Sequence, residues 1–420
     1  MSEVHVSEVR AKAGKARAAS VVMNRMTTAQ KNAALSAMAD ALITEQKLIL
    51  SANEQDLDHG RSQGTSSSLL DRLKLTPERI KDMADGLRQV IELQDPVGET
   101  VQTIQRPNGL HITQIRVPLG VIGMIYEARP NVTVDAAGLC LKTGNAVVLR
   151  GGSAALYSNT TIINVLRQAL QATDIPPEAL QLIEDSNRSS VDEMLKLNDL
   201  LDVIIPRGGS SLIQNVVQNA TVPVIETGAG ICHTYLDASA TVEMAEAISL
   251  NAKVQRPSVC NSMETLLVHQ DYADRYLTAL GETFRKAGVE VRGCQQTQHI
   301  LPWAAAASAE DFATEYNDYI LNVRIVQNLD EALEHISKYG TRHSECIITE
   351  NTAHANRFLQ EVDAAAVYHN ASTRFTDGFE FGFGAEIGIS TQKLHARGPM
   401  GLPALTSTKY RVQGNGQIRG

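Results

Sequence analysis

Residues 121–153 read VIGMIYEARPNVTVDAAGLCLKTGNAVVLRGGS, with short apolar runs at Val121 to Ile125 and at Ala146 to Leu149. Runs of this length are typical of buried strands, and the segment between them is long enough for a crossover helix. A strand, a crossover helix and a second strand in succession build parallel sheet. This stretch therefore predicts an α/β fold with a mostly parallel, doubly wound sheet.

The same alternation continues along the chain and predicts a second α/β domain, with the boundary near residue 250. Helix-spaced apolar stripes before residue 94 predict helices, one of them opened by a Thr27-x-x-Gln30 capping box and another by Thr76-Pro77. The further strands that we expect are Leu180 to Ile183, Val203 to Ile205, Val222 to Ile225, Cys232 to Leu236, Met263 to Val268, Ile320 to Val326, Cys346 to Thr349 and Ala364 to Tyr368.

Two turn sequences predict β-hairpins outside this alternation. Asn108-Gly109 separates two extended runs, and Gly414-Asn415-Gly416 lies between Leu405 to Val412 and the last four residues. Neither hairpin has an obvious partner in the α/β pattern, and an exposed hairpin is a liability unless its edges are covered. We therefore expect both hairpins to form an arm that pairs with another subunit.

Composition argues against several kinds of partner. The chain of 420 residues has a net charge of −9 and 4% aromatic residues, and it contains no basic block with interleaved aromatics, so we expect no nucleic-acid partner. No apolar run approaches the roughly 20 residues that span a bilayer, and the N-terminus lacks the plan of a signal peptide, so we expect a cytoplasmic protein without a membrane partner. The five cysteines are scattered without a C-x-x-C pair, and His335 and His343 lack metal-ligand spacing, so no disulfide framework or metal site is predicted.

One of these cysteines, Cys260, lies in a polar loop between a predicted helix and a predicted strand. Pro257 ends the helix, and the nearby Arg256 and Lys253 would favour the thiolate, which is the nucleophilic form. A cysteine without a disulfide is also among the most buried and inert residue types. On the local sequence alone, Cys260 could be a nucleophile or a packing residue.

Two matching turns each follow a strand and precede a helix: Arg150-Gly151-Gly152-Ser153 and Arg207-Gly208-Gly209-Ser210. Glycines let the backbone approach a ligand closely, helix N-terminal donors favour anions, and arginine adds a bidentate phosphate contact. We interpret both as phosphate-binding turns, although glycine-rich turns also occur there for steric reasons alone. Because no G-x-G-x-x-G is present, any nicotinamide cofactor would be bound in another manner.

Asn131 follows Pro130 after the strand at Val121 to Ile125, in the segment Tyr126-Glu-Ala-Arg-Pro-Asn131. An asparagine amide can donate to an oxyanion in acyl chemistry. The same side chain could instead cap the helix that follows. Both interpretations remain open on the residues alone.

Several of these segments together resemble one family. Residues 326–347, VQNLDEALEHISKYGTRHSECI, are similar over their full span to the signature of the γ-glutamyl phosphate reductases (glutamate-5-semialdehyde dehydrogenases) of the aldehyde dehydrogenase superfamily. Residues 126–131, 255–261, 370–378 and 390–401 are similar to that family too. The resemblance covers essentially the whole chain.

The resemblance implies NADPH-dependent reduction of L-glutamate 5-phosphate to L-glutamate 5-semialdehyde, the second step of proline biosynthesis from glutamate. It implies Cys260 as the nucleophile, Asn131 as the oxyanion donor, and the two Arg-Gly-Gly-Ser turns as NADP-binding turns, with Arg150 suited to the 2′-phosphate. From the hairpin arm we expect a homo-oligomer, and the upstream glutamate kinase is a further expected partner. The residues expected to bind substrate are Arg256, Asn261, Asn370, Ser372, Thr373 and Arg374.

Glu226, thirty-four residues before Cys260, lies in Glu-Thr-Gly-Ala-Gly, which resembles the Glu-Leu-Gly-Gly of hydrolytic aldehyde dehydrogenases. Because a reductase that works from an acyl phosphate should not hydrolyse its thioester, we leave Glu226 out of the catalytic set, and Glu264 stays unassigned. The rival functions are a non-phosphorylating aldehyde dehydrogenase and a cofactor-binding protein without catalysis. The expected domains are a cofactor domain at 1–98 and 119–249 with a return near 375–392, a catalytic domain at 250–374, and oligomerisation hairpins at 99–118 and 393–420.

Overall fold

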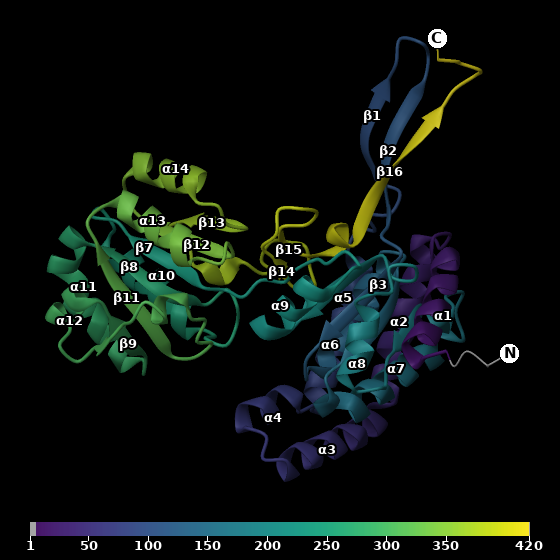
Figure 1. Ribbon diagram of the computed structural model, residues 1–420, viewed down its shortest axis with the longest axis horizontal. Helices are drawn as coiled ribbons and strands as arrows, with labels where there is room; N and C mark the ends of the chain where they lie inside the picture. Colours follow the sequence, from purple (N-terminus) through teal and green to yellow (C-terminus); the bar gives the residue numbers. More distant parts are fainter. Residues whose placement is uncertain (1–5, 420) are drawn as a thin grey trace. The chain divides into compact units, whose positions relative to one another are not determined.

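The computed structural model describes residues 6–419, apart from the side chains of Ser67, Ser68 and Ser210, and it divides into two compact units (Figure 1). Unit 1 runs to Glu226 and also contains Gly382–Gly388 and the chain from Met400 onward. Unit 2 contains Thr227–Phe381 and Ile389–Pro399. None of the helices among residues 6–419 is long and apolar enough to cross a membrane.

Unit 1 begins with helices, as the apolar stripes predicted. The capping box between Thr27 and Gln30 is present at the start of the second helix, and the Thr76 side chain caps the fifth by accepting the N–H of Arg79. These caps satisfy backbone donors that have no partner within the helix. The helices are α1 (Glu8–Met23), α2 (Thr28–Thr44), α3 (Gln46–Ser62), α4 (Ser67–Leu73) and α5 (Pro77–Glu92).

A parallel four-stranded sheet in the order β5-β4-β3-β6 follows in unit 1. Every residue of β3 and β4 is buried, which is expected of a parallel sheet covered on both faces. Val222 to Ile225 was wrongly predicted as a strand, since it makes a single bridge from Val224 to Ile204. The elements are β3 (Val121–Tyr126), α6 (Pro130–Lys142), β4 (Ala146–Gly151), α7 (Leu156–Leu170), β5 (Leu180–Leu182), α8 (Arg188–Met194), β6 (Val203–Arg207) and α9 (Ser210–Asn219).

The hairpin predicted around Asn108-Gly109 is confirmed, and the prediction of a hairpin around Gly414-Asn415-Gly416 is wrong. β1 (Thr100–Gln105) pairs antiparallel with β2 (His111–Pro118), and Gly109 at the turn has φ +87°. β16 (Thr406–Gln413) pairs with the other edge of β2 along its whole length, and no strand follows it before residue 419 (Figure 1). β16 pairs with eight residues along the edge of β2, whereas the few residues after Gly414 could supply fewer backbone hydrogen-bond partners.

Unit 2 is a parallel seven-stranded sheet in the order β10-β9-β11-β8-β7-β12-β13, with a separate core on each face. One core contains residues of α10 (Val242–Val254) and α11 (Gln270–Lys286), and the other contains residues of α13 (Leu329–Tyr339) and α14 (Thr352–Glu361). The sheet is therefore doubly wound. Its strands are β7 (Cys232–Leu236), β8 (Met263–His269), β9 (Glu290–Gly293), β10 (Ala305–Ala306), β11 (Ile320–Val326), β12 (Ser344–Ile348) and β13 (Ala366–His369).

The division between the units falls at Glu226 and Thr227, not near residue 250. β7 was expected in the first sheet, but it pairs with β8 on one side and β12 on the other, so it lies inside the second sheet. A strand's hydrophobic pattern does not say which sheet it joins. The short strands β9 and β10 were not predicted, nor were β14 (Ile389–Ser390) and β15 (Gly398–Pro399), which pair with each other in unit 2.

Candidate functional site

Cys260 lies between α10 and β8, at the amino edge of the sheet of unit 2. Its side chain is half-buried and forms no disulfide. Its carbonyl oxygen accepts the Cys232 thiol at 3.2 Å and packs against Gly230, where an added Cβ would lie 1.5 Å from that oxygen. Only glycine fits there, so the backbone of the loop is held closely.

The Arg374 guanidinium is bound to the loop that carries this cysteine. Its Nε donates to Oε1 of Gln255 at 2.8 Å, and its Nη1 donates to Oδ1 of Asn261. Burial lowers the pKa of Arg374, the positive charge of Arg256 lowers it further, and the nearby Cys260 opposes this shift. Arg374 therefore lies close enough to Cys260 to favour a thiolate or an anionic ligand there, and the exposed Arg256 lies close enough to act on Arg374.

Three other predicted substrate residues hold the loops together. The Asn261 amide donates to the carbonyl oxygens of Thr376 at 2.9 Å and Arg374 at 3.3 Å. The Thr373 hydroxyl donates to the Asn261 carbonyl at 2.7 Å, and the Ser372 hydroxyl accepts the Arg374 N–H at 3.3 Å. Asn261, Ser372 and Thr373 are buried. Their hydrogen bonds brace the loop after β13 against the Cys260 loop and so position Arg374.

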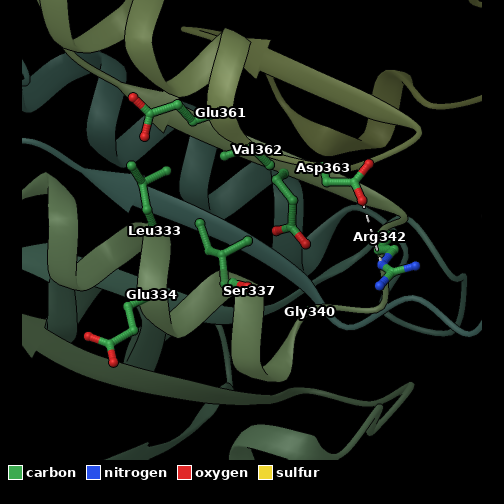
Figure 2. Close-up of a pocket in the computed structure, with 10 residues that line it drawn as sticks. Leu333, Glu334, Ser337, Gly340, Arg342, Glu361, Val362 and Asp363 are labelled. Atoms are coloured by element: carbon green, nitrogen blue, oxygen red, sulfur yellow. Dashed lines mark ion pairs between the residues drawn. The ribbon is translucent and has the colours of Figure 1, made fainter.

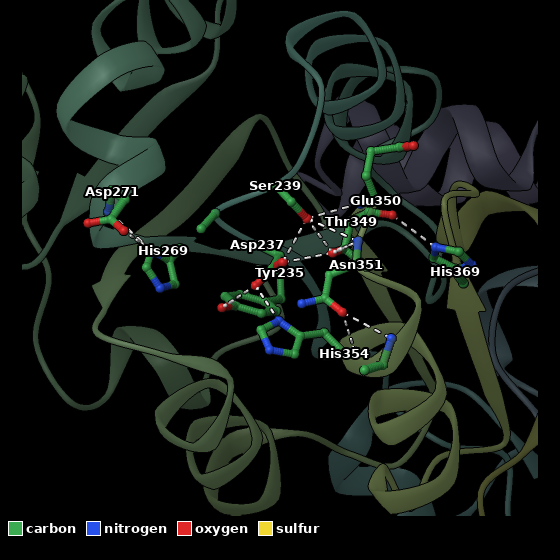
Figure 3. Close-up of polar contacts among 12 residues, drawn as sticks. Tyr235, Asp237, Ser239, His269, Asp271, Thr349, Glu350, Asn351, His354 and His369 are labelled. Atoms are coloured by element: carbon green, nitrogen blue, oxygen red, sulfur yellow. Dashed lines mark hydrogen bonds and ion pairs between the residues drawn. The ribbon is translucent and has the colours of Figure 1, made fainter.

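Asn370 is not brought to Cys260. It follows β13 at the carboxyl edge of the sheet. Its side-chain oxygen accepts the N–H of Thr349 at 2.9 Å, and its side-chain nitrogen donates to the carbonyl oxygen of Thr349 at 3.1 Å. Its φ of +55° is a backbone region that asparagine tolerates better than most residues. At this edge the Thr349 hydroxyl also donates to the buried Asp237, which accepts the Ser239 hydroxyl and faces His354 (Figure 3).

Lys253 was expected to favour the Cys260 thiolate, and this stays a prediction, because the ion-pair partner of Lys253 is another group. Its ammonium is fully buried and pairs with the carboxylate of Glu264 at 2.8 Å. The sequence shows the distance of Lys253 from Cys260 along the chain but not the direction in which the last turn of α10 points its side chain.

The first Arg-Gly-Gly-Ser segment lies at the carboxyl edge of the sheet of unit 1, where Arg150 and Gly151 are the last two residues of β4. The Arg150 guanidinium is nearly buried, and it donates to the carbonyl oxygens of Ser186 at 2.7 Å, Asn187 at 3.1 Å and Gly151 at 3.2 Å. Burial lowers the pKa of Arg150. The predicted contact of Arg150 with a 2′-phosphate is not favoured, because its donors hold the loop after β5. An added Cβ on Gly152 would lie 3.4 Å from the backbone nitrogen of Ala128, and the Ser153 side chain is exposed.

The second turn, at the end of β6, has an anion partner within the chain. The N–H of Gly209 at the start of α9 donates to Oε1 of Glu127 at 3.1 Å, and an added Cβ on Gly208 would lie 2.7 Å from the Glu127 carboxyl carbon. Arg207 beside it is half-buried. Helix N-terminal donors, glycine and arginine fit a phosphate chemically, although Glu127 would have to release the Gly209 N–H. The Ser210 side chain lies outside the described residues.

Asn131 lies in the first turn of α6 and is exposed. Arg129 occupies the cap position, so the helix-cap interpretation is wrong. The Asn131 amide nitrogen donates to Oδ2 of Asp135 at 3.1 Å. Burial raises the pKa of Asp135 to about 6 against the opposing effects of Asn131 and Arg207. The role of Asn131 as an oxyanion donor stays a prediction.

The two histidines of the signature segment lie in different surroundings. His343 Nδ1 is 3.8 Å from the Cys232 thiol, which donates to the Cys260 carbonyl, whereas His335 lies among aromatic rings. Burial lowers the pKa of His335 to about 2, and its ring packs on Phe312 and Tyr339. Among residues 6–419 no group of three histidine, cysteine or acidic side chains could hold a metal ion. A cavity of about 360 Å³ lies beside α13 and is lined by Arg342 and Asp363 among others. Figure 2 shows the ion pair between these two residues. None of the predicted site residues lines this cavity.

Comparison with known proteins shows which family has this sequence and architecture. The aldehyde dehydrogenase family model matches residues 1–314. The γ-glutamyl phosphate reductases of Moorella thermoacetica and Clostridium novyi are 59% and 58% identical, over 98% and 96% of this chain and 99% and 97% of theirs. The crystal structure of γ-glutamyl phosphate reductase from Thermotoga maritima has 50% identity and a TM-score of 0.97, covering 99% of this chain and 100% of that one.

The chain therefore belongs to the aldehyde dehydrogenase family, as the doubly wound parallel sheets and the loop cysteine indicated. Within it, the chain is a member of the γ-glutamyl phosphate reductases. An acetylating aldehyde dehydrogenase from Geobacillus thermoglucosidasius, at 17% identity and a TM-score of 0.70 over 98% of both chains, shares the fold.

Proposed function

We propose that this protein reduces L-glutamate 5-phosphate to L-glutamate 5-semialdehyde with NADPH, releasing phosphate, as the second step of proline biosynthesis. Its family membership over nearly the full chain supports this reaction. The observation that carries it is the half-buried Cys260 in a loop braced to Arg374, on which the charge of Arg256 acts. A nucleophile among cations suits an anionic acyl phosphate.

In this proposal the Cys260 thiolate attacks the acyl carbon of the substrate. A carbon–sulfur bond forms and the carbon–oxygen bond to phosphate breaks, so phosphate leaves with the bonding electron pair and a thioester remains. Arg256 and Arg374 offset the negative charge of the thiolate and of the acyl phosphate. Arg374 is also the proposed partner for the carboxylate of the glutamyl group.

NADPH would supply the hydride that reduces the thioester, after which the thiohemiacetal expels the Cys260 thiolate and releases the aldehyde. The residues proposed to hold the cofactor are those of the two turns, through the backbone of Gly151 and Gly152 and through Arg207 and the Gly209 N–H. Arg150 contributes by shaping the turn. Asn131 is retained as the proposed oxyanion donor, on the family resemblance. Glu226 remains outside the catalytic set.

The proposal includes a homo-oligomer formed through the three-stranded sheet. Seven of the eight residues of β16 are exposed, among them Tyr410 and Val412, and β16 is an edge strand whose outer backbone groups can pair with another chain. Glutamate kinase is the proposed partner that supplies substrate. Because acyl phosphates hydrolyse in water, direct transfer from that kinase would protect the intermediate.

The test is reduction of NADP⁺ by glutamate semialdehyde, with and without phosphate. We expect turnover only with phosphate, and phosphate-independent turnover would instead indicate a non-phosphorylating aldehyde dehydrogenase. Cys260→Ala should lose at least about 10³-fold in kcat, as nucleophile removal does in other covalent enzymes. A folded Cys260→Ala variant with unchanged turnover would refute Cys260 as the nucleophile.

A further inference from the structure

A buried ion pair joins the two ends of the loop that carries Cys260. Lys253 lies in the last turn of α10 and Glu264 is the second residue of β8, so the pair flanks the loop. Nζ of Lys253 is 2.8 Å from Oε2 of Glu264, and neither side chain is exposed. Apolar residues can often replace such a pair without loss of stability, so stability alone does not account for it.

The pair is also connected to the segment before β11. Oε1 of Glu264 accepts the N–H of Asn317 at 3.2 Å, and Asn317 has φ +55°. Two residues earlier, Oε1 of Glu315 accepts the N–H of Gly230 at 2.8 Å. Gly230 in turn packs against the Cys260 carbonyl. The segment containing Glu315 and Asn317 therefore contacts the Cys260 loop in two ways. It bonds Glu264 at the end of the loop, and it bonds Gly230, which packs against Cys260 itself.

Burial disfavours the charged form of both members. It raises the pKa of Glu264 to about 7, against the opposing effects of Lys253 and the Asn317 N–H, while the nearby Glu315 adds to the rise. Burial also lowers the pKa of Lys253, which the charges of Glu264, Asp318 and Cys232 oppose. The fold thus buries the charged forms of Lys253 and Glu264, at a cost in desolvation free energy, at the two ends of the Cys260 loop.

We propose that Lys253 and Glu264 are positioning residues for Cys260. By fixing the separation of the ends of the loop, the pair sets the position of the thiol relative to Arg256 and Arg374. Neither residue touches the substrate in this scheme. The inference rests on the proposed function only in taking Cys260 as the reacting group.

The experiment uses the full-length double variant Lys253→Met/Glu264→Leu, which removes both charges and leaves neither one buried alone. We expect a folded protein whose kcat falls about ten-fold or more, because small misplacements of a reacting group are costly, while KM for both substrates changes less than about two-fold. Alkylation of Cys260 by iodoacetamide, followed by mass spectrometry of its peptide, should require a higher pH, because the thiol is no longer held near the two arginines.

The matched control is Lys31→Met/Asp95→Leu, which removes another buried pair, in unit 1. We expect that control to keep the kcat and the Cys260 alkylation profile of the unmodified protein, whatever its melting temperature. If Lys253→Met/Glu264→Leu also kept both, the pair would serve stability alone and the inference would be overturned.

Should the double variant fail to fold, Glu264→Gln gives the same readouts, because it keeps an oxygen for the Asn317 N–H while removing the charge. A Glu264→Gln protein with unchanged kcat and alkylation would equally overturn the inference. Failure of the proposed function is distinguishable from failure of this inference. In that case the Cys260→Ala variant would keep the NADP⁺ reduction of the unmodified protein.

Discussion

At the scale of single residues, hydrogen-bond partners decide which of the predicted side chains are available for chemistry. Arg150 was predicted from its glycine-rich turn and Asn261 from the family resemblance, yet both donate to backbone carbonyl oxygens of neighbouring loops. Arg374 is placed by Gln255 and Asn261 so that it shares the surroundings of Cys260. The type of a residue is visible in the sequence, whereas its partners depend on how distant loops meet.

Arg374→Lys should lose about ten-fold or more in kcat/KM for glutamate 5-phosphate. A lysine has one ammonium group and cannot reproduce the forked contacts to Gln255 and Asn261. The measurement is initial-rate kinetics beside the melting temperature. Lysine rescue to unmodified kcat/KM would mean that charge alone suffices at this position.

Arg150→Met should destabilise unit 1 by about 1–3 kcal/mol, because the carbonyl oxygens of Ser186 and Asn187 lose a buried donor. The KM for NADPH and the KM for NADH should rise by similar factors. Denaturant unfolding and a comparison of the two cofactors check this prediction. A rise confined to NADPH would restore the original prediction of a 2′-phosphate contact.

Asp135 gives a pH dependence whose sign follows from its raised pKa of about 6. Below its unfolded pKa of roughly 3.9 the carboxyl is protonated in both states. As the pH rises toward 6 the native protein binds a proton that the unfolded chain has released, so this stability contribution is lost. Asp135→Asn does not titrate, so its stability relative to the unmodified protein should increase between pH 4.5 and 7.5 in urea unfolding. An unchanged difference would contradict the raised pKa.

At the scale of elements, the sequence identified most helices and strands but not their partners. The capping box Thr27-x-x-Gln30 and the pair Thr76-Pro77 predicted where α2 and α5 begin, because a helix cap is a local signal. β16 was expected to fold back on the last residues and instead pairs with β2. The paired residues of β2 and β16 lie hundreds of positions apart in the chain, so local pattern does not determine this pairing.

Tyr410→Pro tests the proposed oligomerisation arm at this scale. Proline removes a backbone donor from the ladder of β16 and is poorly accommodated inside a strand. We expect light scattering to show a smaller assembly, while Tyr410→Phe, which keeps the backbone donor, retains the native size. An unchanged mass for Tyr410→Pro would argue against the arm as the interface.

At the scale of the whole molecule, the chain forms two α/β units. The sheet with which a strand pairs decides the unit to which that strand belongs. β7 follows directly after unit 1 in the chain but belongs to the seven-stranded sheet, because β8 and β12 pair with both of its edges. Gly382–Gly388 and Ile389–Pro399 are neighbours in sequence and belong to different units. Composition shifts along the chain mark neither division.

The sequence by itself determined the α/β class, the family and Cys260 as the candidate nucleophile, because periodicity, turn residues and family motifs are local or depend on residue identity alone. The tertiary structure decided which sheet each strand joins, where Asn370 and Arg150 direct their hydrogen bonds, and that Lys253 pairs with Glu264. The physical reason is that burial and hydrogen-bond partners arise from contacts between distant segments.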